Sequence, residues 1–235
     1  MGEFGQAFFE AARLLMALDP ELLGIGLLSL RVSLTAVLIA TLFALPLGAG
    51  LAIARFPGRG IPVAILNALM GLPPVVVGLA VYLLLSRAGP LGEFGLLFTP
   101  GAMVLAQAIL VLPLIAALTR QTVEDLAAEY HDSLAALGAD RRRMLPTLIW
   151  EGRFSLLTAV LAGFGRAIAE VGAVIIVGGN IAGVTRVMTT AITLETAKGN
   201  LGLALGLGSI LVGVTIGVNA LALGVSRLAR TRYGT

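Results

Sequence analysis

The sequence has no cysteine, one histidine and few charged residues, and each shortage excludes a class of protein. Without cysteine the chain forms no disulfide and no thiolate site. Only 12% of its residues are charged and 58% are hydrophobic, whereas a soluble domain has about 25% charged residues. So little charge cannot cover a globule with solvated groups, and so much apolar surface excludes disorder. The mean hydropathy of +1.00 predicts a protein that folds in lipid.

Enzyme signatures are missing as well. His131 is the only histidine, and no HExxH, GxSxG or phosphate-binding P-loop occurs. We therefore expect no catalytic residue and no metal site in this chain. If ATP drives the protein, another polypeptide must hydrolyse it.

Apolar stretches long enough to cross a bilayer, which takes ~20 residues, recur along the chain. Four of them contain no Asp, Glu, Lys or Arg over 23 to 28 residues, namely 32–54, 60–86, 94–119 and 199–226. A fifth, 154–179, carries Arg166 and Glu170. We expect an all-α integral membrane protein, a single domain over 1–235, with about five transmembrane helices of which the fourth is interrupted.

The start of the chain has a different pattern. Residues 6–18 place Phe8, Phe9, Ala12, Leu15 and Met16 on one helical face, which predicts an N-terminal interfacial helix. The first span begins at Val32 or as early as Leu22, in which case Arg31 snorkels or faces protein.

Basic residues are distributed unevenly between the loops. Ten Lys and Arg fall on one side, in 55–59, 120–153 and 227–232, against four on the other. This bias makes the first side cytoplasmic, with the N-terminus outside and the C-terminus inside. It also explains the net charge of +3 without a nucleic-acid partner.

The only long polar loop is 120–153. Apolar residues at spacings of three and four predict a helix over 122–137, Gly138 ends it, and Asp140 favours a new helix start. From composition alone, a solvated cytoplasmic loop is the favoured interpretation.

The run Asp132-Ser-Leu-Ala-Ala-Leu-Gly138-Ala139 resembles the cytoplasmic signature of ABC importer membrane subunits, in which Glu-Ala-Ala is followed after three residues by Gly. Asp132 replaces the Glu, and Ser133 and Leu134 replace the two alanines. The resemblance implies a cytoplasmic coupling helix seated in a cleft of an ATPase subunit. The residues it assigns to ATPase coupling are Asp132, Ser133, Ala135, Ala136, Leu137, Gly138, Ala139, Arg141 and Arg142.

Other stretches are similar to the molybdate, tungstate and sulfate branch of that family, namely 72–79, 165–172, 178–180 and 189–192, and those at 86–92 and 97–100 look most like tungstate-type permeases. The resemblance implies a type I permease fold and oxyanion import, with tungstate first, molybdate next and sulfate third. It also implies a homodimer of this chain, two cytoplasmic ATPases that hold ATP and Mg, and an extracytoplasmic binding protein. No cofactor is expected in this chain.

Arg166 and Glu170 are four residues apart and therefore reach each other on one helix face. They form either a structural ion pair or part of a translocation pathway. Pro73 and Pro74 break a span midway, as a packing kink or, as the resemblance implies, in the pore. The candidate pathway residues are Pro73, Pro74, Val77, Arg166, Glu170, Gly179 and Asn180.

Two further patterns concern packing. Residues 180–200 predict a short interfacial helix on the outer side, and the glycines of 202–224 permit close contact between helices. The rival functions are a secondary transporter or channel, for which Glu170 is the one available carboxylate, and an integral-membrane enzyme, whose polar cluster is absent from the sequence.

Overall fold

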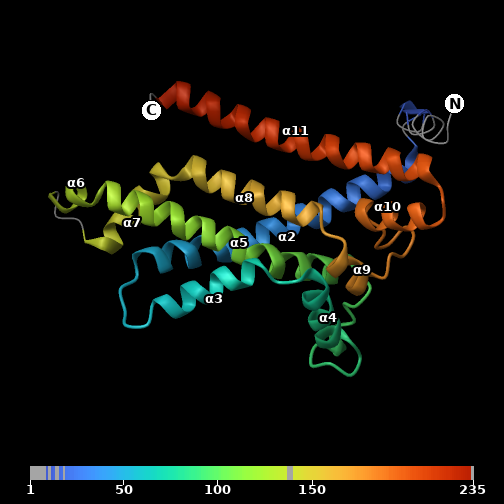
Figure 1. Ribbon diagram of the computed structural model, residues 1–235, viewed down its shortest axis with the longest axis horizontal. Coiled ribbons are helices and arrows are strands. Elements are labelled where there is room, and N and C mark those ends of the chain that lie inside the picture. The colour runs from blue at the N-terminus through green and yellow to red at the C-terminus, as the bar shows by residue number, and fades with distance from the viewer. Residues whose placement is uncertain (1–8, 10–11, 14–15, 18, 137–139, 234–235) are drawn as a thin grey trace.

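The computed structural model describes residues 9, 12–13, 16–17, 19–136 and 140–233, and within these the chain is helical and contains no strand. Three helices are long and apolar enough to cross a membrane: α2 (Pro20–Ile53), α5 (Pro100–Glu129) and α11 (Leu201–Tyr233). Asp19 begins α2 by accepting hydrogen bonds from the N–H groups of Glu21 and Leu22, with Pro20 in the first turn. The three helices run along the long axis of the molecule (Figure 1).

Two bent helix pairs complete the membrane-crossing set. Helix α3 (Gly60–Met70) meets α4 (Pro74–Leu85) at 99°, and α8 (Arg153–Ile168) meets α9 (Gly172–Gly178) at 58°. If each pair is one span, the described chain has up to five, which agrees with the five predicted spans and with breaks in the second and fourth. Helix α4 projects sideways from the bundle (Figure 1).

The bundle is built around the crossing of α2 and α5. At Gly48 of α2 there is no room for a Cβ, which would overlap the carbonyl oxygen of Ala116 and lie 2.8 Å from the Cβ of Thr119. Small residues let two membrane helices approach so closely, and the gain is van der Waals contact along both helices. Ala36, Ala40 and Ala44 of α2 continue this buried face.

Shorter helices occupy the two ends of the bundle. Helix α6 (His131–Ala136), α7 (Arg141–Glu151) and the turn from α2 to α3 lie at one end, where α11 also finishes (Figure 1). We call this the basic end; its loops are those in which the sequence has ten basic residues. Helix α10 (Met188–Ala197) lies at the opposite end with the N-terminus, and η1 (Gly92–Phe94) follows α4. The loops therefore group as the charge bias predicted.

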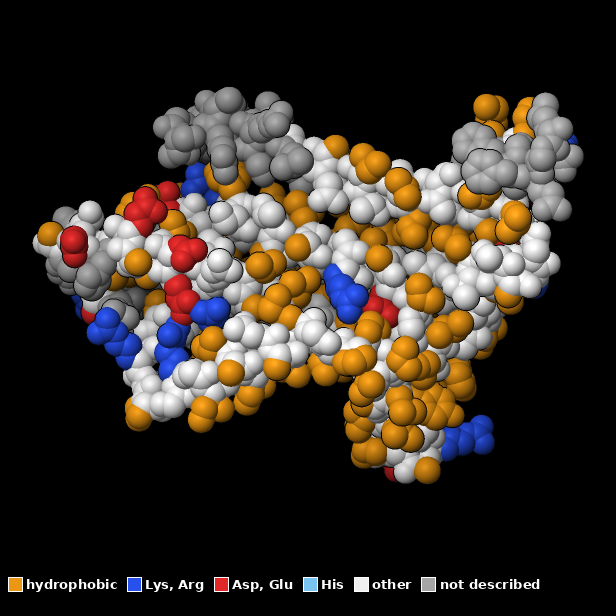
Figure 2. Space-filling view, in the orientation of Figure 1, with side chains coloured by type: hydrophobic (Ala, Val, Ile, Leu, Met, Phe, Trp, Pro, Cys, Tyr) orange, Lys and Arg blue, Asp and Glu red, His pale blue; other side chains and the backbone are white. Residues whose placement is uncertain are grey.

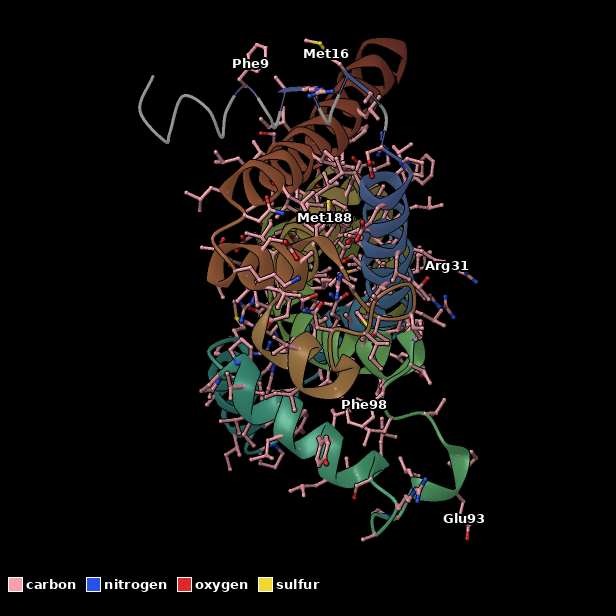
Figure 3. The ribbon with its side chains drawn as sticks, turned by 90° about the vertical axis from the view of Figure 1, so that its right-hand side faces the viewer. Phe9, Met16, Arg31, Glu93, Phe98 and Met188 are labelled. Atoms are coloured by element: carbon pink, nitrogen blue, oxygen red, sulfur yellow. The ribbon has the colours of Figure 1, made fainter. Side chains whose placement is uncertain are left out.

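Two predicted details differ from the structure. The helix predicted over 122–137 is not separate, because α5 continues without interruption to Glu129 and only α6 follows it. Helix α10 exists but is not simply interfacial, since Met188, Thr189 and Thr190 are buried. Most of the predicted N-terminal helix lies outside the described residues. Arg31 is exposed and points away from the bundle (Figure 3).

Candidate functional site

The two helix breaks lie against each other. A Cβ on Gly78 of α4 would approach the Cα of Ala173 in α9 to 2.7 Å, and one on Gly172 would meet the Cγ2 of Val75 at 3.0 Å. Only glycine at these positions allows such an approach. The start of α4, with Pro73 before it and Pro74 in its first turn, is thereby fixed beside the start of α9.

Glu170 is the central residue of the α8/α9 break. Its side chain is only 4% exposed; one carboxylate oxygen accepts a hydrogen bond from the N–H of Ala173 at 3.1 Å, and the other lies 3.9 Å from Nη1 of Arg166. The pairing predicted from the four-residue spacing is therefore observed. Glu170 also satisfies an N–H group at the start of α9 that has no partner within the helix.

Arg166 is placed quite differently from its partner. Its side chain is 40% exposed, and the 3.9 Å separation from Glu170 is at the long end for an ion pair. A guanidinium has five N–H donors, so a single long contact leaves most of its hydrogen-bonding capacity for water or an anion. A cationic group thus stands on the surface of α8 next to both breaks.

Polar residues outside the set of candidate pathway residues hold this region together. Ser29 of α2 accepts a hydrogen bond from the N–H of Met188 at 2.7 Å, Gln107 of α5 donates to the carbonyl of Ala167 at 2.9 Å, and Thr189 of α10 donates to the carbonyl of Glu170 at 2.8 Å. The sequence does mark one of these residues, because Gln107 is the only Asn or Gln in the uncharged run 94–119. Buried polar groups in a membrane protein pair across helices in this way.

Gly179 and Asn180 form a turn at the far end of α9, away from the break. Both have positive φ, 70° and 50°, and a Cβ on Gly179 would overlap the ring of Phe98. Thr185 closes the turn by donating to the carbonyl of Gly178 at 2.5 Å. Figure 3 shows Phe98 near the start of α5, beside this turn.

The candidate pathway residues therefore fall into two groups. Pro73, Pro74, Arg166 and Glu170 gather at the breaks, whereas the turn of Gly179 and Asn180 lies one short helix away. Val77 is buried in the contact between α4 and α9.

Helix α10 carries a second buried acid. Glu195 accepts hydrogen bonds from Lys198 Nζ at 2.8 Å and from Asn200 Nδ2 at 3.1 Å. The hydrogen bond from Lys198 is the main cause that lowers the pKa of Glu195 below its ordinary value, against burial, which raises it. These contacts fix the end of α10 and the loop that leads into α11.

The candidate coupling segment lies at the basic end. Asp132, Ser133 and Ala136 of α6 are exposed, and Ala135 lies in the same helix. Leu137, Gly138 and Ala139 fall outside the described residues. Arg141 and Arg142 form the first turn of α7, which Asp140 caps, as predicted, by accepting from the N–H of Arg143 at 2.8 Å. Figure 2 shows charged side chains of both signs gathered over this end.

Helix α7 is firmly attached to the membrane helices. Its Met144 and Leu148 are buried against Ala49 and Ala52 of α2 and Val123 of α5. A cavity of about 310 Å³ remains between these three helices.

A network of ion pairs connects the turn between α2 and α3 to α5 at the basic end. Arg59 pairs with Glu124 of α5 and donates to the carbonyl of Leu51 at 2.9 Å, and Arg120 pairs with the same carboxylate. Sequence spacing could indicate only the Arg120–Glu124 pair, because Arg59 is distant in the chain. Helices α7, α2 and α5 and the start of α3 are therefore joined at this end of the bundle.

Similarity to known proteins shows the family of this chain. The chain is 42% identical over 205 residues to a probable anion ABC transporter permease protein of Haloferax volcanii, covering 85% of this chain and 88% of that protein. It is 40% identical over 220 residues to the tungstate uptake system permease protein TupB of Peptoclostridium acidaminophilum, covering 94% and 96%. The chain belongs to the permease family of oxyanion ABC transporters.

The permease is also 32% identical over 197 residues to the molybdenum transport system permease protein ModB of Escherichia coli, covering 79% of this chain and 85% of that protein. No family model matches it. Its relatives are named as transporter subunits, so the permease is a multi-pass membrane protein and not an enzyme.

Proposed function

We propose that this permease forms the membrane pathway of an ATP-driven, binding-protein-dependent importer of an oxyanion, with tungstate as the first candidate, molybdate the second and sulfate the third. The single observation that supports it most is the 40% identity to a tungstate uptake permease over 94% of the chain. The site is compatible with an anion, because Arg166 is partly exposed beside two helix breaks and its acidic neighbour is already engaged.

The assembly we propose has two copies of this chain, each a single domain over 1–235. Two cytoplasmic ATPases hold ATP and Mg, and an extracytoplasmic oxyanion-binding protein docks on the other side. The basic end faces the cytoplasm, which puts the N-terminus outside and the C-terminus inside; the excess of Lys and Arg in its loops supports this orientation. Neither nucleic acid nor a cofactor in this chain is part of the proposal.

Coupling starts at α6 and α7. When the ATPases close, they displace the segment around Asp132 and Arg142. Met144 and Leu148 pass this movement to α2 and α5, because they are packed between those helices. The rigid helices then pivot at their breaks, which switches access to the pathway from one side to the other. Irregular backbone at such breaks is tolerated in a membrane where it is buried in protein or lines a cavity.

Purification and reconstitution test the proposal directly. The permease is co-expressed with candidate ATPase subunits, purified in detergent and placed in vesicles, and ATP hydrolysis is measured with tungstate-, molybdate- or sulfate-loaded binding protein outside. Stable association and hydrolysis stimulated most by the tungstate-loaded protein are expected. Failure to associate with any ATPase, or anion uptake that needs no ATPase, contradicts the importer and favours a secondary carrier.

A variant separates coupling from assembly. Gly138→Val is expected to impair the turn that the sequence predicts at this residue and to uncouple hydrolysis from uptake without unfolding the bundle. Normal uptake by Gly138→Val rules out this placement of the coupling segment.

A further inference from the structure

One face of α8 is exposed along almost the whole helix. It consists of Ser155, Thr158, Ala162 and Arg166, which follow one another at spacings of three, four and four residues. We call this set the polar face of α8. Helix α8 itself runs from the basic end to the α8/α9 break (Figure 1).

This face differs from the exposed faces of α2 and α11, on which large apolar side chains predominate. The exposed positions of α2 include Leu38, Leu42 and Phe43, and those of α11 include Val212, Ile216 and Leu221. Between residues 151 and 174, all of them described, no large hydrophobic side chain is exposed. A guanidinium on an exposed membrane helix faces protein or water, because lipid cannot satisfy it. The hydroxyl of Thr158 donates to the carbonyl of Phe154 at 3.0 Å within its own helix, and its oxygen can still accept from water.

Arg166 lies too deep to be solvated at the membrane surface. It is 13 residues beyond Arg153, the first residue of α8, which corresponds to about 20 Å along the helix. A guanidinium at that depth costs several kcal/mol unless water, an anion or a carboxylate reaches it. Glu170 supplies a carboxylate at 3.9 Å only, while its other oxygen is bound to Ala173.

A second polar group at the same level lacks a partner. Gln107 is 3% exposed, and its carboxamide donates to the carbonyl of Ala167, next to Arg166 in the chain, yet among the described residues its Oε1 accepts no hydrogen bond. A buried acceptor of this kind requires a donor such as water. Polar groups on α5 and α8 thus both indicate that water reaches the α8/α9 break from the side of the basic end.

We propose that the polar face of α8 lines the inner half of the translocation route, along which a hydrated tetrahedral oxyanion passes from Arg166 to the basic end. The inference rests on the proposed function and adds Ser155, Thr158 and Ala162 to its pathway. Arg166 attracts the anion, and Glu170 competes for the same guanidinium, so that the anion binds without being trapped. The hydroxyl oxygens of Ser155 and Thr158 accept hydrogen bonds from the water that hydrates the anion. The small side chain of Ala162 leaves space for the hydrated anion to pass.

The absence of cysteine makes a direct test possible. Single-cysteine variants Ser155→Cys, Thr158→Cys and Ala162→Cys are prepared in the complete transporter complex in inside-out vesicles. Matched controls are Ala159→Cys, whose parent residue is buried on the same helix, and Leu38→Cys, whose parent is 69% exposed on α2. Each is treated with an anionic sulfonatoethyl thiosulfonate, a cationic trimethylammonium analogue and a lipid-partitioning maleimide.

All three polar-face cysteines are expected to react with the water-soluble reagents, and the anionic reagent is expected to react faster. Replacing Arg166 by Met in the Ala162→Cys variant should lower the ratio of anionic to cationic rates roughly fivefold, since the nearest positive charge is removed. Anionic labelling of Thr158→Cys should block tungstate uptake. Ala159→Cys should stay unreactive with all three reagents, and Leu38→Cys should react with the maleimide alone.

Three results would overturn the inference. Polar-face cysteines that react only with the maleimide face lipid, and cysteines that react with nothing are covered by a second copy of the chain. A rate ratio that ignores Arg166 excludes an anion route there. If ATP-driven uptake is normal in any of these cases, only the inference fails; an assembled complex with no ATP-driven uptake contradicts the proposed function instead.

Discussion

The two helix breaks lie against each other, yet different chemistry produces them. At the α3/α4 break, the adjacent Pro73 and Pro74 remove two N–H donors and disfavour a helical conformation in the residues before them, so the local sequence itself favours a break. At the α8/α9 break there is no proline, and the irregular backbone is held by the side chain of Glu170 and by Thr189 from another helix. The first break is fixed locally, whereas the second exists because distant parts of the chain have folded around it. A break of the second kind is the one that a partner can alter.

The largest expected effect comes from removing the acid of the second break. Glu170→Leu leaves the N–H of Ala173 without an acceptor, which costs about 1–3 kcal/mol, and it also removes the carboxylate that faces the partly exposed Arg166. We expect a marked fall in Tm in detergent. Pro74→Ala is the matched change at the first break, and it should leave Tm almost unchanged because Pro74 is in the first turn of α4.

Glu170→Gln sharpens the same comparison, because it keeps an acceptor for Ala173 and removes only the charge. Tm should fall less than in Glu170→Leu, while uptake by the reconstituted complex should fall clearly. Unchanged uptake with a lowered Tm would make the pair structural.

The next effect concerns the contact that joins the breaks. Gly78→Val places a side chain against the Cα of Ala173, and overpacking of this kind costs about 1–3 kcal/mol. Tm and uptake should both fall. Gly50→Ala is the control, since a Cβ at Gly50 meets nothing within 4 Å; an equal loss in both variants would mean that the α4 to α9 approach is unimportant.

A smaller effect is expected at the hydrogen bond that α10 makes to the second break. Thr189→Val keeps the shape of the side chain and loses the donor to the carbonyl of Glu170, which should cost about 1 kcal/mol. Hydrogen exchange should rise at Ala173 and its neighbours in α9 and not in α4. Equal changes in both helices would refute the difference between the breaks.

The smallest effect is a dependence on pH. Because the pKa of Glu195 is lower in the folded protein than its ordinary value of 4.5, its ionised form stabilises the fold above that value. This contribution is lost as pH falls through the lowered folded pKa. Tm of the parent protein should therefore decline below about pH 4.5 more steeply than Tm of Glu195→Gln. Parallel curves would exclude Glu195 as the source.

Much of this architecture is predictable from the sequence, because its causes are local. Runs of apolar residues determine the five spans, the two prolines break the second, and the four-residue spacing brings Arg166 to Glu170. Asp140 likewise marks the start of α7. The roles of Ser29 and Thr189 were not predictable, since each depends on a partner far along the chain. The same applies to the buried side of α10, whose threonines look suited to a surface until α2 and the α8/α9 break pack against them.

The length of α2 has a consequence for how the protein sits in the bilayer. At 1.5 Å per residue, its 34 residues extend about 51 Å, well beyond the ~30 Å hydrocarbon layer. The part that follows the outward-pointing Arg31 is about 33 Å long and suffices to cross it (Figure 3). With Arg31 among the lipid headgroups, the first three turns of α2 extend beyond the bilayer to the level of α10. There the ion pair between Arg186 and Glu21 connects α2 to the loop before α10.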